Sequence, residues 1–326
     1  MIINRTLLLR LYRTMLRIRL CEESLVEAIR SGEIRTPCHL YSGEEAVATG
    51  ISIALKRKDY IFGTHRSHGH YLAKGGSLQK MVAEIYCRAA GCAGGRGGSM
   101  HLIAAEVGVL GTAPIVAGTI SLAVGAALAA SIRRDRRVAV AFFGDGATGE
   151  GVLYESLNFA ALRSLPVIFV CENNLYSTHL PIRECRPNKP IYKIAAPFGI
   201  AARRLDGNNV LDVFRAATWA VNRCRSGKGP VFLECLTYRQ RGHVGPDDNI
   251  QGSYTDIRPL AEIERWRKKD PIVRFERLLL AKKAASRDGL AKIRAAIDRE
   301  VTEANEFARR SPRPEPDEVT AHVFKT

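Results

Sequence analysis

The chain of 326 residues is predicted to adopt an α/β fold: a mostly parallel sheet flanked by helices, followed by a helical C-terminal extension. Two observations predict this class. Residues 138–143 (Val-Ala-Val-Ala-Phe-Phe) form a continuous apolar run, which is typical of a strand buried on both faces of a parallel sheet. Short apolar runs also alternate with helix-like segments along the chain, as expected when helices cover both faces of a sheet.

The first half of the chain is expected to begin with helices. Leucines at helical spacing predict a helix over residues 4–30, and residues 44–55 predict a second one. A short strand over 60–62 is expected to follow, then a glycine-containing loop with His65, His68 and His70, which shows no apolar period, and a helix over 78–86. Residues 91–98 are rich in glycine and are expected to form a loop.

The second half is expected to continue the alternation of helices and strands. Strands are predicted over residues 138–143, 167–171 and 231–236, and helices over 120–132, 151–163 and 210–224. Charged helices are expected over 259–309 and an extended proline-rich stretch over 311–317. We therefore expect an α/β domain over residues 1–285 and a helical segment with an extended tail over 286–326.

Composition and charge disfavour two classes of protein. The formal net charge of +16 is dispersed along the chain, and no zinc-finger spacing or aromatic-rich RNA signature accompanies it. We expect no nucleic-acid partner, and a role of the charge in docking other proteins. No charged residue occurs between Val107 and Ile132, but Gly, Ala, Ser and Thr dominate and Pro114 interrupts the stretch, so a packed helix is favoured over a membrane span.

The cysteines and the N-terminus indicate a cytoplasmic protein. The eight cysteines form no Cys-x-x-Cys pair, and several lie in apolar runs, which suits buried free thiols in a reducing compartment. The apolar N-terminal residues 1–20 are interrupted by arginines, and they lack the uninterrupted core and cleavage site of a signal peptide.

Two polar motifs directly follow two successive predicted strands. Gly144-Asp145-Gly146 lies between strand 138–143 and helix 151–163, and Asn174 follows the strand over 167–171. In parallel sheets, ligands bind beyond the carboxyl ends of the strands, so both motifs can face one ligand. Glycines allow the backbone close to a diphosphate, and a helix start offers free N–H groups. A carboxylate, an amide oxygen and a backbone carbonyl are hard ligands suited to Mg²⁺.

Gly-Asp-Gly followed at this distance by Asn-Asn resembles the thiamine-diphosphate-binding motif. The resemblance extends over about residues 5–285 to the α subunits of two-subunit E1 enzymes, the family of the pyruvate, branched-chain 2-oxo-acid and acetoin dehydrogenases. The stretches that carry it are Pro37 to Gly50, Thr64 to His70, Gly94 to His101 and Leu165 to Asn174.

The resemblance implies roles for individual residues. Asp145, Asn174 and the carbonyl of Tyr176 would bind Mg²⁺. His68 would face the substrate and His243 would reach the diphosphate or the reacting centre; histidine suits both roles because its ordinary pKa lies near working pH. His39 would lie near the site. The further cofactor-binding residues implied are His65, Arg66, Ile115, Val116, Gly144, Gly146 and Ala147.

The resemblance also implies an activity and partners. The α subunit would bind thiamine diphosphate and Mg²⁺, decarboxylate a 2-oxo acid or cleave acetoin, and transfer the acyl group to a lipoylated E2 acyltransferase. It would act only with a β subunit, in an α2β2 heterotetramer, because the glutamate that activates the cofactor comes from the β subunit. An alternative is an acyloin-forming or transketolase-like enzyme that uses the same cofactor outside a dehydrogenase complex.

Departures from the family pattern bear on this choice. Pro114 stands where glycine is common, so it fixes the local backbone and removes an N–H. Val244-Gly245-Pro246-Asp247 replaces a Ser-x-Ser-Asp-type loop, so the serine that animal enzymes phosphorylate is absent and the acyl acceptor is left open. A non-catalytic relative is disfavoured by the intact Asp145 and Asn174, and a nicotinamide-dependent enzyme by the lack of Gly-x-Gly-x-x-Gly at a first strand–helix turn.

Overall fold

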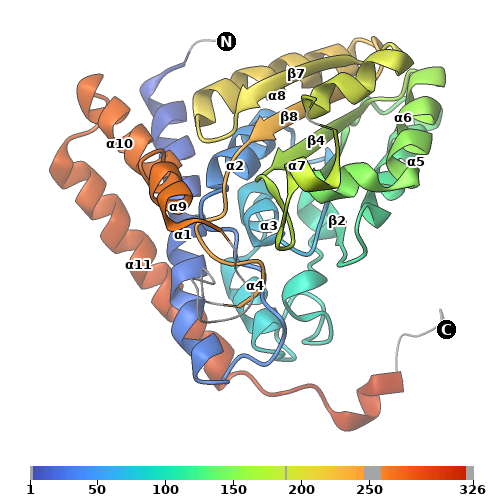
Figure 1. Cartoon of the computed structure of the whole chain (residues 1–326). Coiled ribbons are helices and arrows are strands. Elements are labelled where there is room, and N and C mark those ends of the chain that lie inside the picture. The colour runs from blue at the N-terminus through green and yellow to red at the C-terminus, as the bar shows by residue number, and fades with distance from the viewer. Residues whose placement is uncertain (1–2, 188, 246–257, 321–326) are drawn as a thin grey trace.

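The computed structural model describes residues 3–187, 189–245 and 258–320 (Figure 1). At its centre is a six-stranded sheet in the order β2-β1-β3-β4-β8-β7, with every neighbouring pair parallel. The predicted α/β class is therefore confirmed. The strands of this sheet are β1 (Tyr60–Gly63), β2 (Val109–Thr112), β3 (Ala139–Gly144), β4 (Val167–Asn173), β7 (Ala201–Asp206) and β8 (Val231–Leu236). A two-stranded hairpin is formed by β5 (Tyr176–Ser177) and β6 (Leu180–Pro181).

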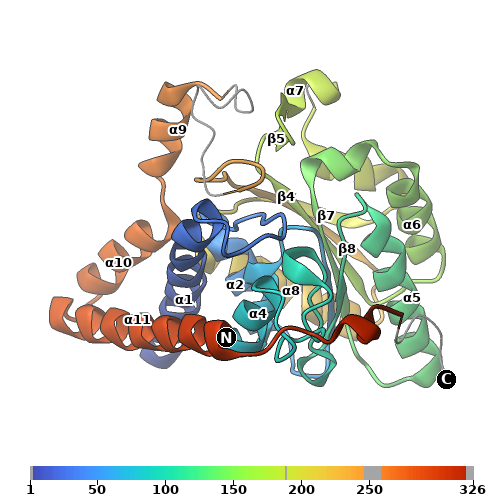
Figure 2. The ribbon, with the colours of Figure 1, turned by 90° about the horizontal axis from the view of Figure 1, so that it is seen from below.

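Helices cover both faces of the sheet (Figures 1 and 2). On one face α5 packs on β1 and β3 and beside α6, and on the other α8 packs on β4, β7 and β8 and against α2. The helices before the C-terminal part are α1 (Arg5–Arg30), α2 (Glu45–Ala54), α3 (His68–Lys74), α4 (Leu78–Ile85), α5 (Gly118–Arg133), α6 (Gly151–Leu162), α7 (Ile182–Cys185) and α8 (Val210–Arg225). Short 3₁₀ segments include η3 (Asp145–Gly149) and η4 (Ile191–Phe198).

Alternation along the strands divides the interior into two hydrophobic cores. Val140 and Phe142 belong to the core shared with α1, α2 and α8, whereas Ala141 and Phe143 belong to the core under α5 and α6. Successive side chains of a strand point to opposite faces. A strand that borders two cores must therefore be apolar at every position, which explains the uninterrupted run in the sequence.

Among the elements that differ from the sequence prediction are α3, β2 and β7. The segment with His68 and His70 was expected to be a loop, but it forms α3, whose seven residues are too few to display a clear helical period. β2 was not predicted because Val109–Thr112 lies inside the uncharged stretch. β7 was not predicted because it is an edge strand that carries the exposed Arg203 and Arg204 and so lacks an apolar run.

The uncharged stretch 107–132 forms β2 and most of α5, in agreement with the prediction of a packed helix. Among the helices of the described part of the chain, none has the length and apolar character needed to cross a bilayer. All eight cysteines are free, as expected, and five of them are buried, whereas Cys185 is exposed.

The carboxylate of Glu84, at the end of α4, organises the glycine-rich loop. Its two oxygens accept four backbone N–H groups, from Ala93, Gly95, Gly97 and Gly98, at 2.7–3.1 Å. Glu84 is fully buried, and hydrogen bonds to an ionised acceptor are about twice as strong as neutral ones. This single side chain therefore provides the hydrogen-bond acceptor for four of the backbone N–H groups of the loop.

The C-terminal part consists of α9 (Leu260–Arg267), α10 (Pro271–Ala281) and α11 (Arg287–Arg310), followed by η5 (Pro316–Thr320). Charged helices were expected here. The tail was expected to be extended over 311–317, but its last part lies in η5. α11 packs along α1 and α4, and α10 packs on α1 (Figure 2).

Asp270 connects this part to the rest of the domain. It caps α10 by accepting the N–H groups of Ile272 and Val273 at 2.8 and 3.0 Å. It also pairs with Arg19 of α1 at 2.8 Å and accepts Gln240 Nε2 at 2.6 Å. Burial opposes its ionisation, but Arg19 and these hydrogen bonds outweigh burial and hold the pKa of Asp270 below its ordinary value.

We predict that Asp270→Asn destabilises the protein by about 2 kcal/mol, less than the ~3–5 kcal/mol of a fully uncompensated buried charge because Glu45 still pairs with Arg19. A carboxylate with a depressed pKa contributes stability above its unfolded pKa of about 3.9, and that stability is lost as pH falls through the folded value. Urea unfolding at several pH values should therefore show a difference from wild type that shrinks below about pH 4. The exposed Asp298→Asn is the control; an Asp270→Asn penalty that does not change with pH would contradict the prediction.

Candidate active site

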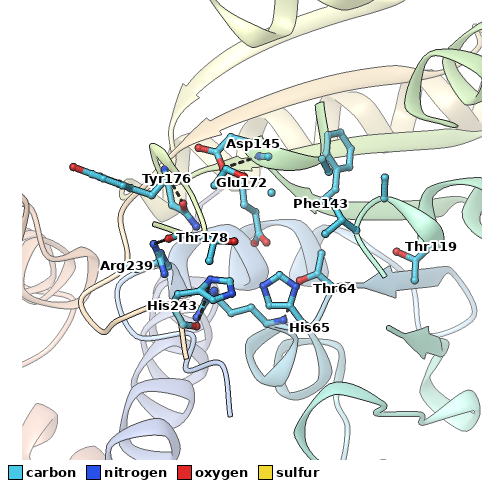
Figure 3. Close-up of a pocket in the computed structure, with 18 of the residues that line it drawn as sticks. Thr64, His65, Thr119, Phe143, Asp145, Glu172, Tyr176, Thr178, Arg239 and His243 are labelled. Carbon is cyan, nitrogen blue, oxygen red and sulfur yellow. Dashed lines mark hydrogen bonds between the residues drawn. The ribbon is translucent and has the colours of Figure 1, made fainter. Parts of the chain in front are cut away.

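A pocket lies beyond the carboxyl ends of β3, β4 and β8 (Figure 3). The parallel pairing of β3 with β4 sets Gly144 opposite Glu172, so the two strands end at the same edge of the sheet. The residues directly after these strand ends, Asp145 and Asn174, both line the pocket, as does Tyr176. The two motifs singled out in the sequence are thus brought to one cavity.

Asp145 is a buried carboxylate with one unsatisfied oxygen. Its Oδ1 accepts the N–H of Gly146 at 2.9 Å, while Oδ2 is buried without a hydrogen-bond partner among the described residues. Burial raises the pKa of Asp145 to about 6. A buried carboxylate is costly unless it is paired or coordinates a metal, so this oxygen fits a cation ligand.

Asn174 and Tyr176 supply further oxygens beside Asp145. The Asn174 side chain is buried; its Nδ2 donates to Glu44 Oε1 at 3.3 Å, and its Oδ1 accepts the Tyr176 N–H at 3.3 Å. The Tyr176 hydroxyl donates to Glu262 at 2.8 Å, away from this group. Carboxylate, amide and carbonyl oxygens are the donors that Mg²⁺ prefers, so the residues present fit this ion.

The glycines and the alanine of the motif line the pocket as expected. A Cβ on Gly146 would lie 2.4 Å from Ser177 Oγ, so any larger residue there would require the Ser177 side chain to move. A Cβ on Gly144 would meet no atom within 4 Å. Ala147 is buried in η3.

Arg66 also lines the pocket and is held from several sides. Nη1 donates to the carbonyl of Leu40 at 2.8 Å and Nη2 to the carbonyl of His243 at 3.0 Å. Its Nε lies 3.7 Å from a carboxylate oxygen of Glu44. Burial, followed by the charge of Glu172, raises the pKa of Glu44 to about 8. Nη1 retains a second N–H, and Nη2 makes only a longer contact of 3.4 Å to His243 Nδ1 with its own, so the guanidinium can still bind an anion.

His65 and His243 lie close together on one wall, with Asp145 and Tyr176 on the opposite side of the pocket in Figure 3. Their ring centroids are 5.4 Å apart. Burial and then Arg66 lower the pKa of His65 to about 3 and that of His243 to about 2. Both imidazoles are therefore neutral in this chain, and the expectation of a pKa near working pH is not met for His243.

His68 does not line the pocket. It is fully buried in α3, where its Nδ1 lies 3.0 Å from Glu22 and its Nε2 2.8 Å from Ser99 Oγ. Both ring nitrogens are therefore engaged within the protein. The structure does not bring His68 to this pocket, because α3, which carries it, packs against α1.

Ile115 and Val116 lie at the pocket mouth, just before α5. Although apolar, they are 71% and 50% exposed. His39 does not line the pocket itself, but its ring contacts those of His65 and His243 at centroid distances of 4.6 and 5.0 Å. All three residues therefore lie at or beside the pocket.

Three further charged residues of the pocket, Glu44, Glu172 and Arg239, were not singled out in the sequence. Arg239 follows β8 and is buried, as Asp145 and Asn174 follow their strands, so its position after a strand could have revealed it. Glu44 comes just before α2, and no strand-end signal marks it. The site therefore contains more buried charge of both signs than the motifs alone indicated.

The parallel α/β sheet with a pocket at its strand ends defines the class of α/β proteins that bind a ligand at this edge of the sheet. Comparison with known sequences identifies the family within this class. The chain belongs to the family described as dehydrogenase E1 component, which matches residues 12–317. The resemblance to E1 α subunits is thereby confirmed.

Relatives of the chain include two bacterial α subunits. The chain is 38% identical to the α subunit of the acetoin:2,6-dichlorophenolindophenol oxidoreductase of Bacillus subtilis over 314 residues, which cover 96% of this chain and 92% of the relative. It is 39% identical to the pyruvate dehydrogenase E1 component subunit alpha of Rhizobium meliloti over 317 residues, which cover 97% and 89%. A pyruvate dehydrogenase E1 α subunit of Porphyra purpurea is 37% identical, with 97% and 92% coverage.

We predict that Asp145→Asn stabilises the metal-free protein at pH 7, by roughly 1–3 kcal/mol, because it removes a buried charge whose pKa is raised. A carboxyl group with a raised pKa costs stability as pH rises from its unfolded value through the folded value of about 6. The advantage of the variant should therefore be absent below about pH 4 and complete above about pH 7, as measured by urea unfolding in the presence of a chelator. A variant less stable than wild type at pH 7 would show that the carboxylate is satisfied within the protein; Asp298→Asn is the control.

Proposed function

We propose that this chain is the α subunit of a thiamine-diphosphate- and Mg²⁺-dependent E1 component. In this proposal it decarboxylates a 2-oxo acid or cleaves acetoin, and transfers the acyl group to a lipoylated acyltransferase. The observation that carries the proposal is the unsatisfied Asp145 Oδ2, buried in the same pocket as Asn174 and Tyr176 in a member of the E1 family.

In the proposed site the residues of this chain hold and orient the cofactor. Asp145, Asn174 and the Tyr176 carbonyl would bind Mg²⁺. Arg66, with its remaining N–H groups, and the neutral His65 and His243 would donate hydrogen bonds to the diphosphate. When bound, thiamine diphosphate supplies the electron sink for cleaving the bond next to a carbonyl carbon.

A partner subunit would complete the pocket. The volume of the pocket is only about 80 Å³, far below the ~300–1,000 Å³ typical of small-molecule sites. Large apolar side chains are exposed at the pocket mouth and on α5 and α6, which lie together at one edge of the molecule (Figure 2). They are Ile115, Val116, Leu122, Ile132, Tyr154, Phe159 and Leu162. An apolar surface of this kind marks a protein interface, so a β subunit in an α2β2 assembly is the proposed partner.

The proposal also covers the acceptor of the acyl group and the location of the protein in the cell. Lipoamide is preferred over an aldehyde because the relatives include subunits named for pyruvate dehydrogenase. Val244 is 42% exposed next to the pocket residue His243, while Pro246 and Asp247 of the altered loop lie outside the described residues. The eight free thiols support a cytoplasmic location.

We predict that Asp145→Asn weakens Mg²⁺-dependent binding of thiamine diphosphate by more than ~100-fold, because loss of a direct metal ligand should exceed the ~10–100-fold cost of losing a supporting group. Isothermal titration of the complex with its cognate β subunit measures this. Asp298→Asn should bind the cofactor as wild type does. Unchanged affinity in the Asp145 variant would remove the metal assignment.

We also predict that the purified chain alone has no 2-oxo-acid decarboxylase activity, whereas its mixture with the cognate β subunit does. Turnover assays with pyruvate, with branched 2-oxo acids and with acetoin, each with a lipoyl domain or an aldehyde as acceptor, test this. Acyl transfer to the lipoyl domain is expected. Activity of the chain alone would contradict the need for a partner, and transfer to aldehydes only would favour the acyloin-forming alternative.

A further inference from the structure

A groove runs along α8 and past its C-terminal end. Its volume is about 670 Å³. The residues of α8 that line it recur at intervals of three and four between Phe214 and Ser226, so they share one face of the helix. Three cations, Arg215, Arg223 and Lys228, line the groove, and among the described residues no carboxylate does. The groove is therefore a cationic surface that its own lining does not neutralise.

The groove also contains apolar surface. Phe214 and Ile3 line it together with the half-buried Trp219. The guanidinium of Arg203 lies 3.8 Å from the centre of the Trp219 ring and covers one of its faces. A ligand that fills the groove must therefore carry apolar groups as well as negative charge. A chain in which acidic and apolar side chains alternate meets both requirements, because successive side chains of an extended peptide point to opposite sides.

The capping of α8 does not require these cations. Cations are favoured near a helix C-terminus because its last carbonyls lack partners. Here the N–H groups of residues 226, 227 and 228 already bond to carbonyls of the last turn at 3.0–3.1 Å. Arg223 Nε is buried and has no hydrogen-bond partner in the part of the chain that the structure describes. Arg215 lies in the second turn, where its exposed contact with Asp212 at 3.4 Å contributes little. These donors are thus open to an external anion.

The groove ends beside a row of cations at the edge of the sheet opposite the pocket. The loops before β1, β3, β4 and β8 meet at this edge, because these strands are neighbours and parallel. A Cβ on Gly229 would lie 3.7 Å from Ser164 Cα, so the loops before β8 and β4 are in contact. Lys58 Nζ donates to the Asp135 carbonyl at 3.0 Å, which links the loops before β1 and β3. The exposed cations of these loops include Arg57, Lys58, Arg133, Arg134, Arg136 and Arg163.

The carboxylates of these loops are already paired. Asp59 is buried and pairs with Arg225, and Asp135 lies 3.2 Å from Arg137. The exposed Glu106 lies farther out, before β2 at the end of the sheet. The row of cations therefore retains an excess of positive charge next to the groove.

We propose that the α8 groove and the row of cations beside it bind an acidic, partly apolar peptide segment of a partner protein. Between Phe214 and Ser226 the helix rises about 18 Å, and the row crosses three strand spacings, about 14 Å. An extended segment of about ten residues covers this length. A membrane surface would leave the concave groove unfilled, and a nucleic acid would bring no apolar chain to Phe214 and Trp219. The row lies at the other edge of the sheet from the pocket, so the segment can bind independently of the cofactor.

The test titrates a decapeptide of alternating glutamate and leucine into the full-length chain by isothermal calorimetry, without thiamine diphosphate or Mg²⁺. Saturable binding is expected. The double variant Arg215→Glu/Lys228→Glu should bind at least ~10-fold more weakly, because each reversal replaces an attraction by a repulsion and one exposed charge pair contributes up to ~5-fold. The peptide should also change the tryptophan emission. Trp219→Phe should lose this change, since the other tryptophan, Trp266, is stacked on Tyr238.

A matched double variant separates the groove from general charge attraction. Arg35→Glu/Arg313→Glu makes the same change of charge at two exposed residues outside the groove and should bind the peptide as wild type does. Arg35 follows the far end of α1, whose 26 residues span about 39 Å from the end next to Ile3. Circular dichroism checks folding, and Arg215→Gln/Lys228→Gln replaces the charge reversal if that variant unfolds.

Three further probes decide the class of ligand. A decapeptide of alternating lysine and leucine should not bind. A single-stranded DNA decanucleotide and vesicles of phosphatidylserine and phosphatidylcholine should bind more weakly than the acidic peptide. Tighter binding of the oligonucleotide or of the vesicles would assign the surface to nucleic acid or to a membrane and would overturn the proposal. The same follows if the acidic peptide shows no saturable binding, or if both double variants lose affinity equally.

Discussion

The parallel register between β3 and β4 is the constraint on which the site depends. Because Gly144 pairs with Glu172, Asp145 and Asn174 emerge at the same edge of the sheet and line one pocket. A slip of one residue would turn every side chain of a strand to the other face. The two hydrophobic cores oppose such a slip, since each accepts only its own half of the β3 side chains. Packing on both faces of the sheet therefore fixes the positions of the polar side chains at its edge.

The pocket concentrates buried charge that packing alone does not require. Asp145, Glu44 and Glu172 face Arg66 and Arg239, and burial moves the pKa of Asp145 and of Glu44 toward the neutral form. Groups in this condition cost stability in the free chain. The burial of apolar side chains in the two large cores offsets this loss of folding free energy. Lower stability of the free chain is expected where a fold positions buried charged groups to bind a ligand.

The sequence predicted the elements whose pattern is set by burial, and missed those whose pattern is not. β3 and β4 are apolar at every position because both faces are covered, so they were found together with the motifs that follow them. α3 is too short to show a period, and the exposed arginines of β7 conceal a strand. The position of His68 could not be inferred, because it depends on a buried pair with Glu22 from α1. The meeting of His39 with His65 and His243 likewise depends on tertiary contacts.

Glu84 holds the glycine-rich loop through main-chain amides only. Because this carboxylate contacts only the backbone, it places no requirement on the side chains of the loop. The N–H of Arg96 does not bond to Glu84, and its guanidinium pairs with Glu318 of η5 instead. Gly95 and Gly98 are restricted by positive φ, and Gly97 by the close His101 carbonyl. The path of the loop therefore depends on the carboxylate at 84 and on these glycines.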